Sequence, residues 1–193
     1  MSAKAISDIL AHSAAVKLAT AEQCSAPAFE ASKVIATSLQ SGGKLLLCGN
    51  GGSAGDAQHL AAEFVATLDH QRPRAGLAAI ALTTDTSFIT AYSNDFDFVG
   101  IFSRQVETLG KKGDVLIGIS TSGNSKNVVA AMKAAREGGI ATIAFSGEEG
   151  GEICDYADIV LSVPSRTTMH IQEAHIALGH VITLTVEKLV GHG

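Results

Sequence analysis

The sequence predicts an α/β fold built on a doubly wound, five-stranded parallel sheet flanked by helices, and two observations lead to this class. First, five short runs are apolar at nearly every position, which is typical of parallel strands buried on both faces. Second, these runs alternate with longer segments of helical spacing, which predicts right-handed βαβ units. The runs are 44–48, 77–82, 114–119, 140–145 and 158–163.

The segment before the first strand is predicted to be helical. Between residues 4 and 40, apolar residues such as Ile6, Ile9, Val34 and Leu39 recur at helical spacing. Pro27 lies inside this stretch, and proline removes a backbone donor and clashes with the preceding turn. We therefore expect two N-terminal helices with a break near Pro27, the second ending at the SGG sequence of residues 41–43.

Further helices are predicted after the strands. One begins near Ser53, another near Lys126, and a last long helix runs from about His170 to Val190. Because no linker, repeat or low-complexity tract divides the chain, we expect a single domain over residues 1–193.

Composition narrows the classes of partner. The chain has 14 Lys and Arg against 19 Asp and Glu, a net charge of −5, which does not favour nucleic acid, because neutralising phosphates needs many basic side chains. No apolar run approaches the roughly 20 residues that span a bilayer, and the first residues lack the pattern of a secretory signal, so we expect no membrane partner. The cysteines Cys24, Cys48 and Cys154 are odd in number and far apart, which is typical of a reduced, cytoplasmic protein.

Two turns that follow strands are rich in glycine and hydroxyl groups. After the first strand, Gly49, Gly51 and Gly52 allow a sharp turn and a close approach of the backbone to a ligand. Ser53 is expected to cap the next helix, whose free amides attract an anion. After the third strand, STSGNS at 120–125 places hydroxyl groups around the flexible Gly123.

The two turns together favour a phosphorylated small molecule as ligand. Neither matches GxxxxGK[ST] or GxGxxG, the patterns for nucleoside triphosphates and dinucleotides. Each alone is more often an ordinary βα turn, in which Gly, Ser and Asn are common. Both, however, follow strands of a doubly wound sheet, and ligands bind at the carboxyl ends of such strands.

Two of the predicted helices carry candidate acid–base or metal-binding residues. Asp56, His59 and Glu63 lie near one stripe of the helix after the first turn, because residues three and four apart share a face. The last helix carries Gln172 and His180. Histidine and carboxylate side chains bind zinc or exchange protons. A solvated pair is the more frequent explanation of the HxxxE spacing, and spacing alone does not bring the two helices together.

Four stretches, CGNGGSAGDAQHLAAEF, TTDTSFITAYSNDF, FSRQVETLGKKGDVLIGISTSGNSKNV and IQEAHIALGH, resemble the phosphoheptose isomerases. The resemblance covers nearly the whole chain and is weakest over the first 40 residues, whereas STSGNS alone marks only the broader sugar-isomerase (SIS) fold. The resemblance to the phosphoheptose isomerases implies a flavodoxin-like sheet and a homotetramer in which residues 1–40 take part in oligomerisation. It further implies sites completed by a neighbouring subunit and one zinc ion per subunit.

The resemblance also implies an activity and the residues that perform it. The activity is isomerisation of sedoheptulose 7-phosphate to D-glycero-D-manno-heptose 7-phosphate through an enediol, an early step toward bacterial heptose-containing lipopolysaccharide. His59, Glu63, Gln172 and His180 match the metal ligands, Glu63 also matches the general base, and His180 the general acid. The positions that match substrate contacts are Asn50, Gly51, Gly52, Ser53, Glu63, Asn94, Asp95, Ser120, Thr121, Ser122, Ser125 and Gln172.

The chain departs from the family pattern near the first predicted metal helix. Thr67 stands where the family commonly has an arginine that contacts substrate, and the following loop, DHQRPRAG, is slightly longer than usual. Arg72 or Arg74 is a candidate replacement for that charge. No role is assigned to His175, because a lone histidine on an apolar helix is more often a hydrogen-bonded core residue.

Three other functions compete with this one. A non-catalytic relative that binds a replication initiator protein lacks the metal-site glutamate, so the presence of Glu63 favours the enzyme. A phosphosugar-sensing regulatory domain is usually joined to a DNA-binding module, which this sequence does not show. An isomerase of another phosphosugar is the nearest rival, and Thr67 keeps it open.

Overall fold

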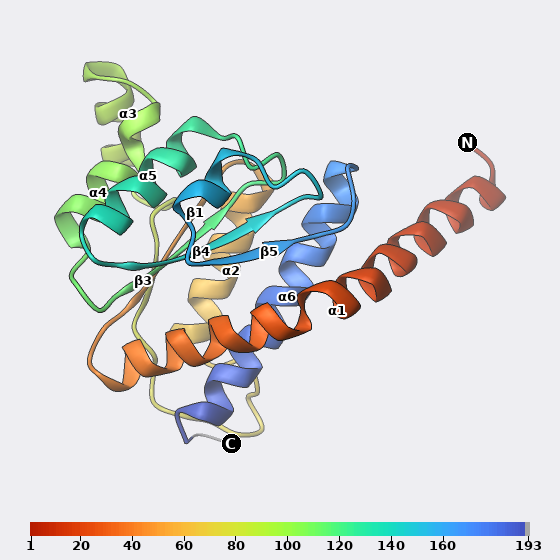
Figure 1. Cartoon of the computed structure of the whole chain (residues 1–193), viewed down its shortest axis with the longest axis horizontal. Coiled ribbons are helices and arrows are strands. Elements are labelled where there is room, and N and C mark those ends of the chain that lie inside the picture. The colour runs from red at the N-terminus through yellow and green to blue at the C-terminus, as the bar shows by residue number, and fades with distance from the viewer. Residues whose placement is uncertain (192–193) are drawn as a thin grey trace.

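A computed structural model describes residues 1–191, which form a parallel sheet between two layers of helices (Figure 1). The strands are β1 (Leu45–Gly49), β2 (Ala79–Ala81), β3 (Val115–Ile119), β4 (Ala141–Ser146) and β5 (Ile159–Ser162). The α-helices are α1 (Ala3–Gln40), α2 (Gly52–Val65), α3 (Thr86–Asp95), α4 (Ser103–Leu109), α5 (Lys126–Glu137) and α6 (Thr168–Leu189). Two short 3-10 helices are η1 (Val99–Ile101) and η2 (Glu152–Tyr156).

The strand order confirms the predicted doubly wound sheet. Within the described residues the five strands lie in the order β2-β1-β3-β4-β5, and every neighbouring pair is parallel. This is the flavodoxin-like order. The chain adds β2 on one side of β1 and then β3, β4 and β5 on the other, so the switch point lies between β1 and β3. The turns that follow β1 and β3 therefore lie at the switch point, where open α/β sheets bind ligands.

The sheet buries both faces because alternate side chains of each strand point to opposite sides. Leu45 and Leu47 of β1 pack toward α1, α2 and α6, whereas Leu46 and Cys48 pack toward α4 and α5. The same alternation continues in β3, β4 and β5. Continuous apolar runs in the sequence are the consequence in β1 and β3, which are buried at every position, whereas Ile80 of the edge strand β2 is exposed.

The prediction of two N-terminal helices is wrong, because residues 3–40 form the single helix α1. Pro27 lies inside α1 and costs it one backbone hydrogen bond, which packing on both sides offsets. Cys24 and Ala28 are buried beside the proline, and Gln23 and Cys24 donate hydrogen bonds to the carbonyl of Ser162 at the end of β5. Tertiary contacts thus hold the helix continuous where local propensity favours a break.

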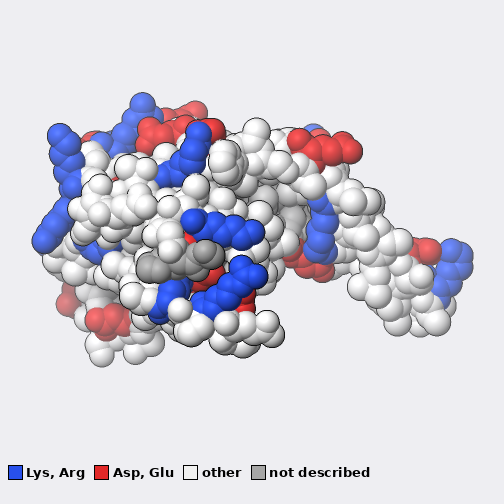
Figure 2. Space-filling view, turned by 90° about the horizontal axis from the view of Figure 1, so that it is seen from below, with Lys and Arg blue, Asp and Glu red and all other residues white. Residues whose placement is uncertain are grey.

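The first turns of α1 project beyond the rest of the chain (Figure 1), and Figure 2 shows this projection as mostly uncharged surface on one face. Ile6, Leu10 and Leu18 are exposed on it. No helix among residues 1–191 is long and apolar enough to cross a membrane.

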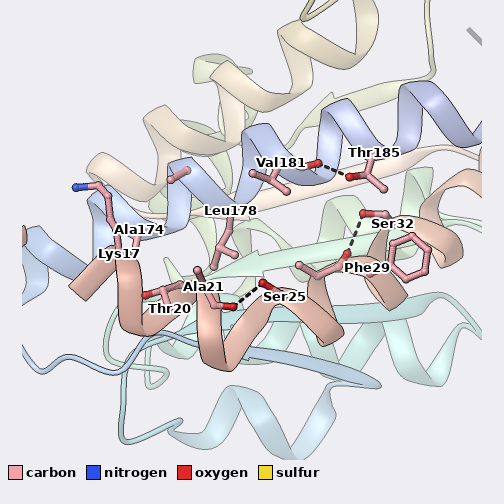
Figure 3. Close-up of a pocket in the computed structure, with 12 residues that line it drawn as sticks. Lys17, Thr20, Ala21, Ser25, Phe29, Ser32, Ala174, Leu178, Val181 and Thr185 are labelled. Atoms are coloured by element: carbon pink, nitrogen blue, oxygen red, sulfur yellow. Dashed lines mark hydrogen bonds between the residues drawn. The ribbon is translucent and has the colours of Figure 1, made fainter. Parts of the chain in front are cut away.

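An apolar groove of about 360 Å³ runs between α1 and α6 (Figure 3). Phe29 of α1 and Leu178 and Val181 of α6 contribute to its wall. Phe29 and Val181 are about half exposed, which is a large exposure for side chains of their size and polarity.

Candidate active site

The first glycine-rich turn connects β1 to α2 at the switch point of the sheet. Gly51 caps α2 with φ +57°, a left-handed conformation that glycine adopts without steric cost. The prediction that Ser53 caps the helix is wrong, because Ser53 lies inside the first turn, where it is buried and its backbone N–H donates to the Asn50 carbonyl at 3.0 Å. The backbone N–H groups of Ser53, Ala54 and Gly55 donate to carbonyls within this turn, so the amides before Ser53 are the candidates for an anion site.

The second turn connects β3 to α5 and gathers hydroxyl groups. The Ser120 hydroxyl lies 3.0 Å from that of Ser125 and 3.5 Å from that of Ser122. Gly123, with φ +66°, packs so tightly that a Cβ atom there would lie 1.6 Å from the Gly150 carbonyl oxygen. The turn is therefore fixed by the loop after β4, and its hydroxyl groups converge without a basic side chain among them.

Asn127 joins the two turns, and the sequence interpretation missed it. The side-chain amides of Asn50 and Asn127 exchange two hydrogen bonds, each 2.8 Å long, and Asn127 is buried. An asparagine just inside a helix carries no distinguishing sequence signal, because asparagine is common near helix starts. Only the adjacency of β1 and β3 shows that it fixes one of the two turns against the other.

His59 and Glu63 of α2 meet His180 of α6 in one cluster. The Nε2 atom of His59 lies 3.0 Å from Nε2 of His180 and 3.0 Å from Oε1 of Glu63, and His180 Nε2 lies 3.4 Å from the same oxygen. Residues 121 positions apart are thus brought together, as the metal assignment requires. The helices approach closely here because Gly179 packs against Leu60, with no room for a side chain.

The donor set of this cluster fits a zinc ion. Two imidazole nitrogens and one carboxylate oxygen are a common zinc ligand set, and ligand atoms around a tetrahedral zinc lie about 3.3 Å apart. The three separations of 3.0, 3.0 and 3.4 Å match that spacing. Buried oxygens of Glu63 (Oε2) and Asp56 (Oδ2) have no hydrogen-bond partner within residues 1–191. Burial raises the pKa of the Asp56 carboxyl, and the nearby imidazoles of His59 and His180 oppose this shift.

Gln172 lies at the amino end of α6, against the first glycine turn. A Cβ atom on Gly52 would lie 2.0 Å from the Gln172 amide nitrogen, so glycine is required for this contact. Gln172 therefore lies beside the proposed phosphate turn, eight residues and about 12 Å of helix from His180. Its role as a fourth metal ligand stays a prediction.

The predicted substrate contacts divide into two groups. Thr121 and Ser122 line a polar cavity of about 360 Å³ with Ser165 and Thr168 from the loop before α6 and its first turn. The residues at the end of α3 are not among those gathered here: Asn94 and Asp95 are exposed and hydrogen-bond to each other at 2.9 Å. Figure 1 shows α3 projecting beyond α4 and α5.

Arg74 does not replace the family arginine at the position of Thr67. Its side chain is 1% exposed and pairs with Glu187 of α6 at 2.7 Å, so it is not free to contact a substrate. Arg72 is exposed and lies 3.7 Å from Asp69. Thr67 itself turns its hydroxyl toward Glu187, at 3.4 Å.

His175 is a hydrogen-bonded core residue, as is usual for a lone histidine on an apolar helix. It is fully buried against Phe145, and its Nε2 atom lies 3.0 Å from the Ser146 carbonyl. A carbonyl only accepts hydrogen bonds, so Nε2 carries the proton. Burial lowers the pKa of His175 to about 4, and the bond to Ser146 opposes this shift.

The fold and the turns at its switch point define a SIS-domain protein. The family model described as the SIS domain matches residues 10–147, more than half of the chain.

More specific likenesses extend over nearly the whole length. The chain is 50% identical over 185 residues to the phosphoheptose isomerase of Aquifex aeolicus, covering 96% of each protein. It is 58% identical over 158 residues to that of Roseiflexus sp. (strain RS-1), covering 82% of this chain and 79% of the relative. The solved structure of the Neisseria gonorrhoeae phosphoheptose isomerase superposes with a TM-score of 0.89 at 43% identity, covering 96% of this chain and 98% of that one. This chain belongs to the phosphoheptose isomerase family, a family of isomerases.

Proposed function

We propose that this protein isomerises sedoheptulose 7-phosphate to D-glycero-D-manno-heptose 7-phosphate, an aldose–ketose exchange that supplies heptose for bacterial lipopolysaccharide. The observation that carries the proposal is the His59, Glu63 and His180 cluster on the two helices whose amino ends flank the phosphate turns. Proton-transferring groups and a phosphate anchor are the two requirements for moving a proton between adjacent carbons of a phosphosugar.

The proposed mechanism uses Glu63 as the base and His180 as the acid. Glu63 removes a proton from C1 of the ketose, the C–H electron pair forms the C1–C2 double bond of an enediol, and the π pair of the C2 carbonyl moves onto its oxygen, which takes a proton from His180. The C1 hydroxyl then returns a proton to His180 as the C1 carbonyl forms, and Glu63 returns its proton to C2, which yields the aldose. No electrons leave the substrate, so this exchange requires no redox cofactor.

A zinc ion fits the same residues. His59, Glu63 and His180 would hold it, with Gln172 as the fourth ligand that the family resemblance assigns. Once bound, zinc supplies Lewis-acid polarisation of a carbonyl oxygen.

The two turns anchor the far end of the substrate. Backbone amides of Asn50 to Gly52 and hydroxyl groups of Ser53, Ser120, Thr121, Ser122 and Ser125 are the proposed phosphate donors. Binding the phosphate there holds C1 and C2 in place at the histidine cluster. Asn94 and Asp95, which lie outside the cluster of a single chain, are proposed to contact substrate in the assembled oligomer.

We further propose a cytoplasmic homotetramer whose sites are shared between subunits. The exposed apolar side chains of the projecting part of α1 and the open α1–α6 groove support an interface between copies. The three cysteines are free, as in a reducing compartment.

Turnover of sedoheptulose 7-phosphate by the purified protein tests the function. We expect activity that disappears on chelation and returns with zinc. Zinc-loaded protein without activity on this substrate would contradict the proposal. A parallel assay on five- and six-carbon ketose phosphates would then reveal an isomerase of another phosphosugar, and inactivity on all of them would favour the non-catalytic relative.

A further inference from the structure

A buried ion pair lies between the carboxyl end of α2 and α6, beyond the histidine cluster. The Arg74 guanidinium, on the loop between α2 and β2, contacts Oε1 of Glu187 on α6 through Nη2 at 2.7 Å and Nε at 2.8 Å. The side chains are 1% and 6% exposed. Such burial is costly for charged groups unless each is paired and hydrogen-bonded, so the remaining contacts of the pair decide its role.

Arg74 also binds the backbone of the helix that carries Glu63. Its Nη2 atom donates to the Glu63 carbonyl and its Nη1 atom to the Phe64 carbonyl, both at 2.8 Å. The last carbonyls of a helix have no partner within the helix, and a cation there also complements the helix dipole. Arg74 therefore fixes the backbone of Glu63 itself, the residue whose carboxylate enters the cluster.

Glu187 performs the corresponding task from α6. Its Oε1 atom accepts from the Leu68 backbone N–H at 3.1 Å as well as from Arg74. Glu187 lies seven residues after His180, two turns along α6, so both side chains lie on the same face of that helix. The face that presents His180 to Glu63 is thus the face that holds the end of α2.

We propose that the Arg74–Glu187 pair is a positioning device for the metal centre. It fixes α2 against α6 so that the Glu63 carboxylate and the His180 imidazole stay at ligand spacing. Arg74 contacts Glu63 through its backbone carbonyl, and among the described residues neither Arg74 nor Glu187 hydrogen-bonds to the side-chain ligand atoms of the cluster. This inference rests on the proposed metal site, whose ligands come from the two helices that the pair joins.

The experiment separates positioning from stability. In the double variant Arg74→Met/Glu187→Met, apolar side chains replace both charges, a change that is often neutral or stabilising for a buried pair. The hydrogen bond to the Glu63 carbonyl is lost with them. We expect a folded protein whose zinc affinity, measured by competition with a chromophoric chelator, falls about 10- to 100-fold, the usual effect of removing a group that orients ligands. We also expect the absorption bands of the cobalt-substituted protein to change.

Two further variants complete the test. Arg74→Lys keeps a charge for Glu187 but has one ammonium group in place of the guanidinium fork, so we expect an intermediate zinc affinity, and this variant carries the test if the double variant does not fold. Lys44→Met removes the partially buried Lys44–Asp114 pair at the start of β1 and β3, and we expect lower stability with unchanged zinc affinity.

Each outcome addresses one inference. Two results would overturn the metal site and with it the positioning role. One is a wild-type protein that does not bind one zinc ion per chain, and the other is a His59→Ala variant that binds zinc as tightly as the wild type. Tight binding by the wild type, with equal affinity and an unchanged cobalt spectrum in the folded double variant, overturns the positioning role alone.

Discussion

At the scale of single residues, Glu63 is notable because its two carboxylate oxygens have different surroundings. Oε1 lies within 3.4 Å of both histidines of the cluster, whereas Oε2 is buried without a hydrogen-bond partner among residues 1–191. One oxygen is thus placed to bind a cation, whereas the other is buried. The assignment of Glu63 as a metal ligand is consistent with this geometry, and its role as the base stays a prediction.

Replacing Glu63 by glutamine tests that assignment. The amide cannot accept the carbon-bound proton, and loss of a general base costs about 10²- to 10⁴-fold in rate. We expect kcat to fall by at least 100-fold with the fold intact, measured on protein of known zinc content. Glu107→Gln, an exposed carboxylate of α4, serves as the control. Near-wild-type turnover in Glu63→Gln would refute the base assignment.

His175 makes the stability of the fold dependent on pH. Burial lowers its pKa to about 4 from an ordinary value of 6.5, so the unfolded chain binds the proton more tightly. The stability from the neutral histidine is complete above about pH 6.5 and is lost as pH falls toward 4, by about 3 kcal/mol at the lower limit.

The variant His175→Gln removes this titration, and its amide nitrogen can still donate to the Ser146 carbonyl. We expect the free energy of unfolding of the wild type, measured by denaturant titration, to fall by about 3 kcal/mol more than that of His175→Gln between pH 7 and pH 4. Parallel pH profiles for the two proteins would show that His175 is not the responsible group.

At the scale of elements, the turn between β3 and α5 depends on a glycine for two separate reasons. Gly123 has a positive φ, and its Cα touches the Gly150 carbonyl so closely that a methyl group does not fit. Gly42, in the turn after α1, has a positive φ of 82° with open space around it. A side chain at Gly42 would therefore cause backbone strain alone, whereas a side chain at Gly123 would cause both backbone strain and a steric clash.

We therefore expect Gly123→Ala to raise KM for the phosphosugar at least tenfold, because the displaced turn no longer converges its hydroxyl groups. Gly42→Ala carries the strain alone and should lose about 1 kcal/mol of stability with KM unchanged. Steady-state kinetics and thermal unfolding of both variants provide the comparison. An unchanged KM in folded Gly123→Ala would exclude this turn from the phosphate site.

At the scale of the whole molecule, α1 and α6 leave an apolar surface that a single chain does not cover. The groove between them is open, and Phe29 and Val181 on its wall are about half exposed. The exposed end of α3, with Asn94 and Asp95, is likewise separate from the site in one chain. The tetramer with shared sites that we propose would account for both features.

Phe29→Asp tests this assembly by placing a charge on the α1 side of the groove, at a residue outside the proposed catalytic set. We expect the wild type to have four times the chain mass of 19.8 kDa in light scattering, and the variant to have a smaller mass and reduced turnover. Leu109→Asp alters a comparably exposed apolar residue on α4 and should remain tetrameric. A wild type that is monomeric at assay concentration would contradict the assembly.

Local patterns in the sequence predicted the sheet, the two turns and the shared face of His59 and Glu63, whereas Gln172 and His180 were assigned as ligands from the family resemblance. Doubly buried strands produce continuous apolar runs, and turns that bind phosphate need glycine and hydroxyl groups next to a strand end. The HxxxE spacing fixed His59 and Glu63 on one face of a helix. All of these signals lie within a few residues of chain.

The remaining features depend on packing between distant segments, which local patterns do not reveal. Contacts with β5 keep α1 continuous through Pro27, although local propensity predicts a break. The close approach of Gly179 to Leu60 brings His180 to Glu63, and the adjacency of β1 and β3 pairs Asn127 with Asn50. Arg74 is buried by Glu187, 113 residues away. These outcomes depend on contacts between residues far apart in the chain, which spacing along a sequence does not encode.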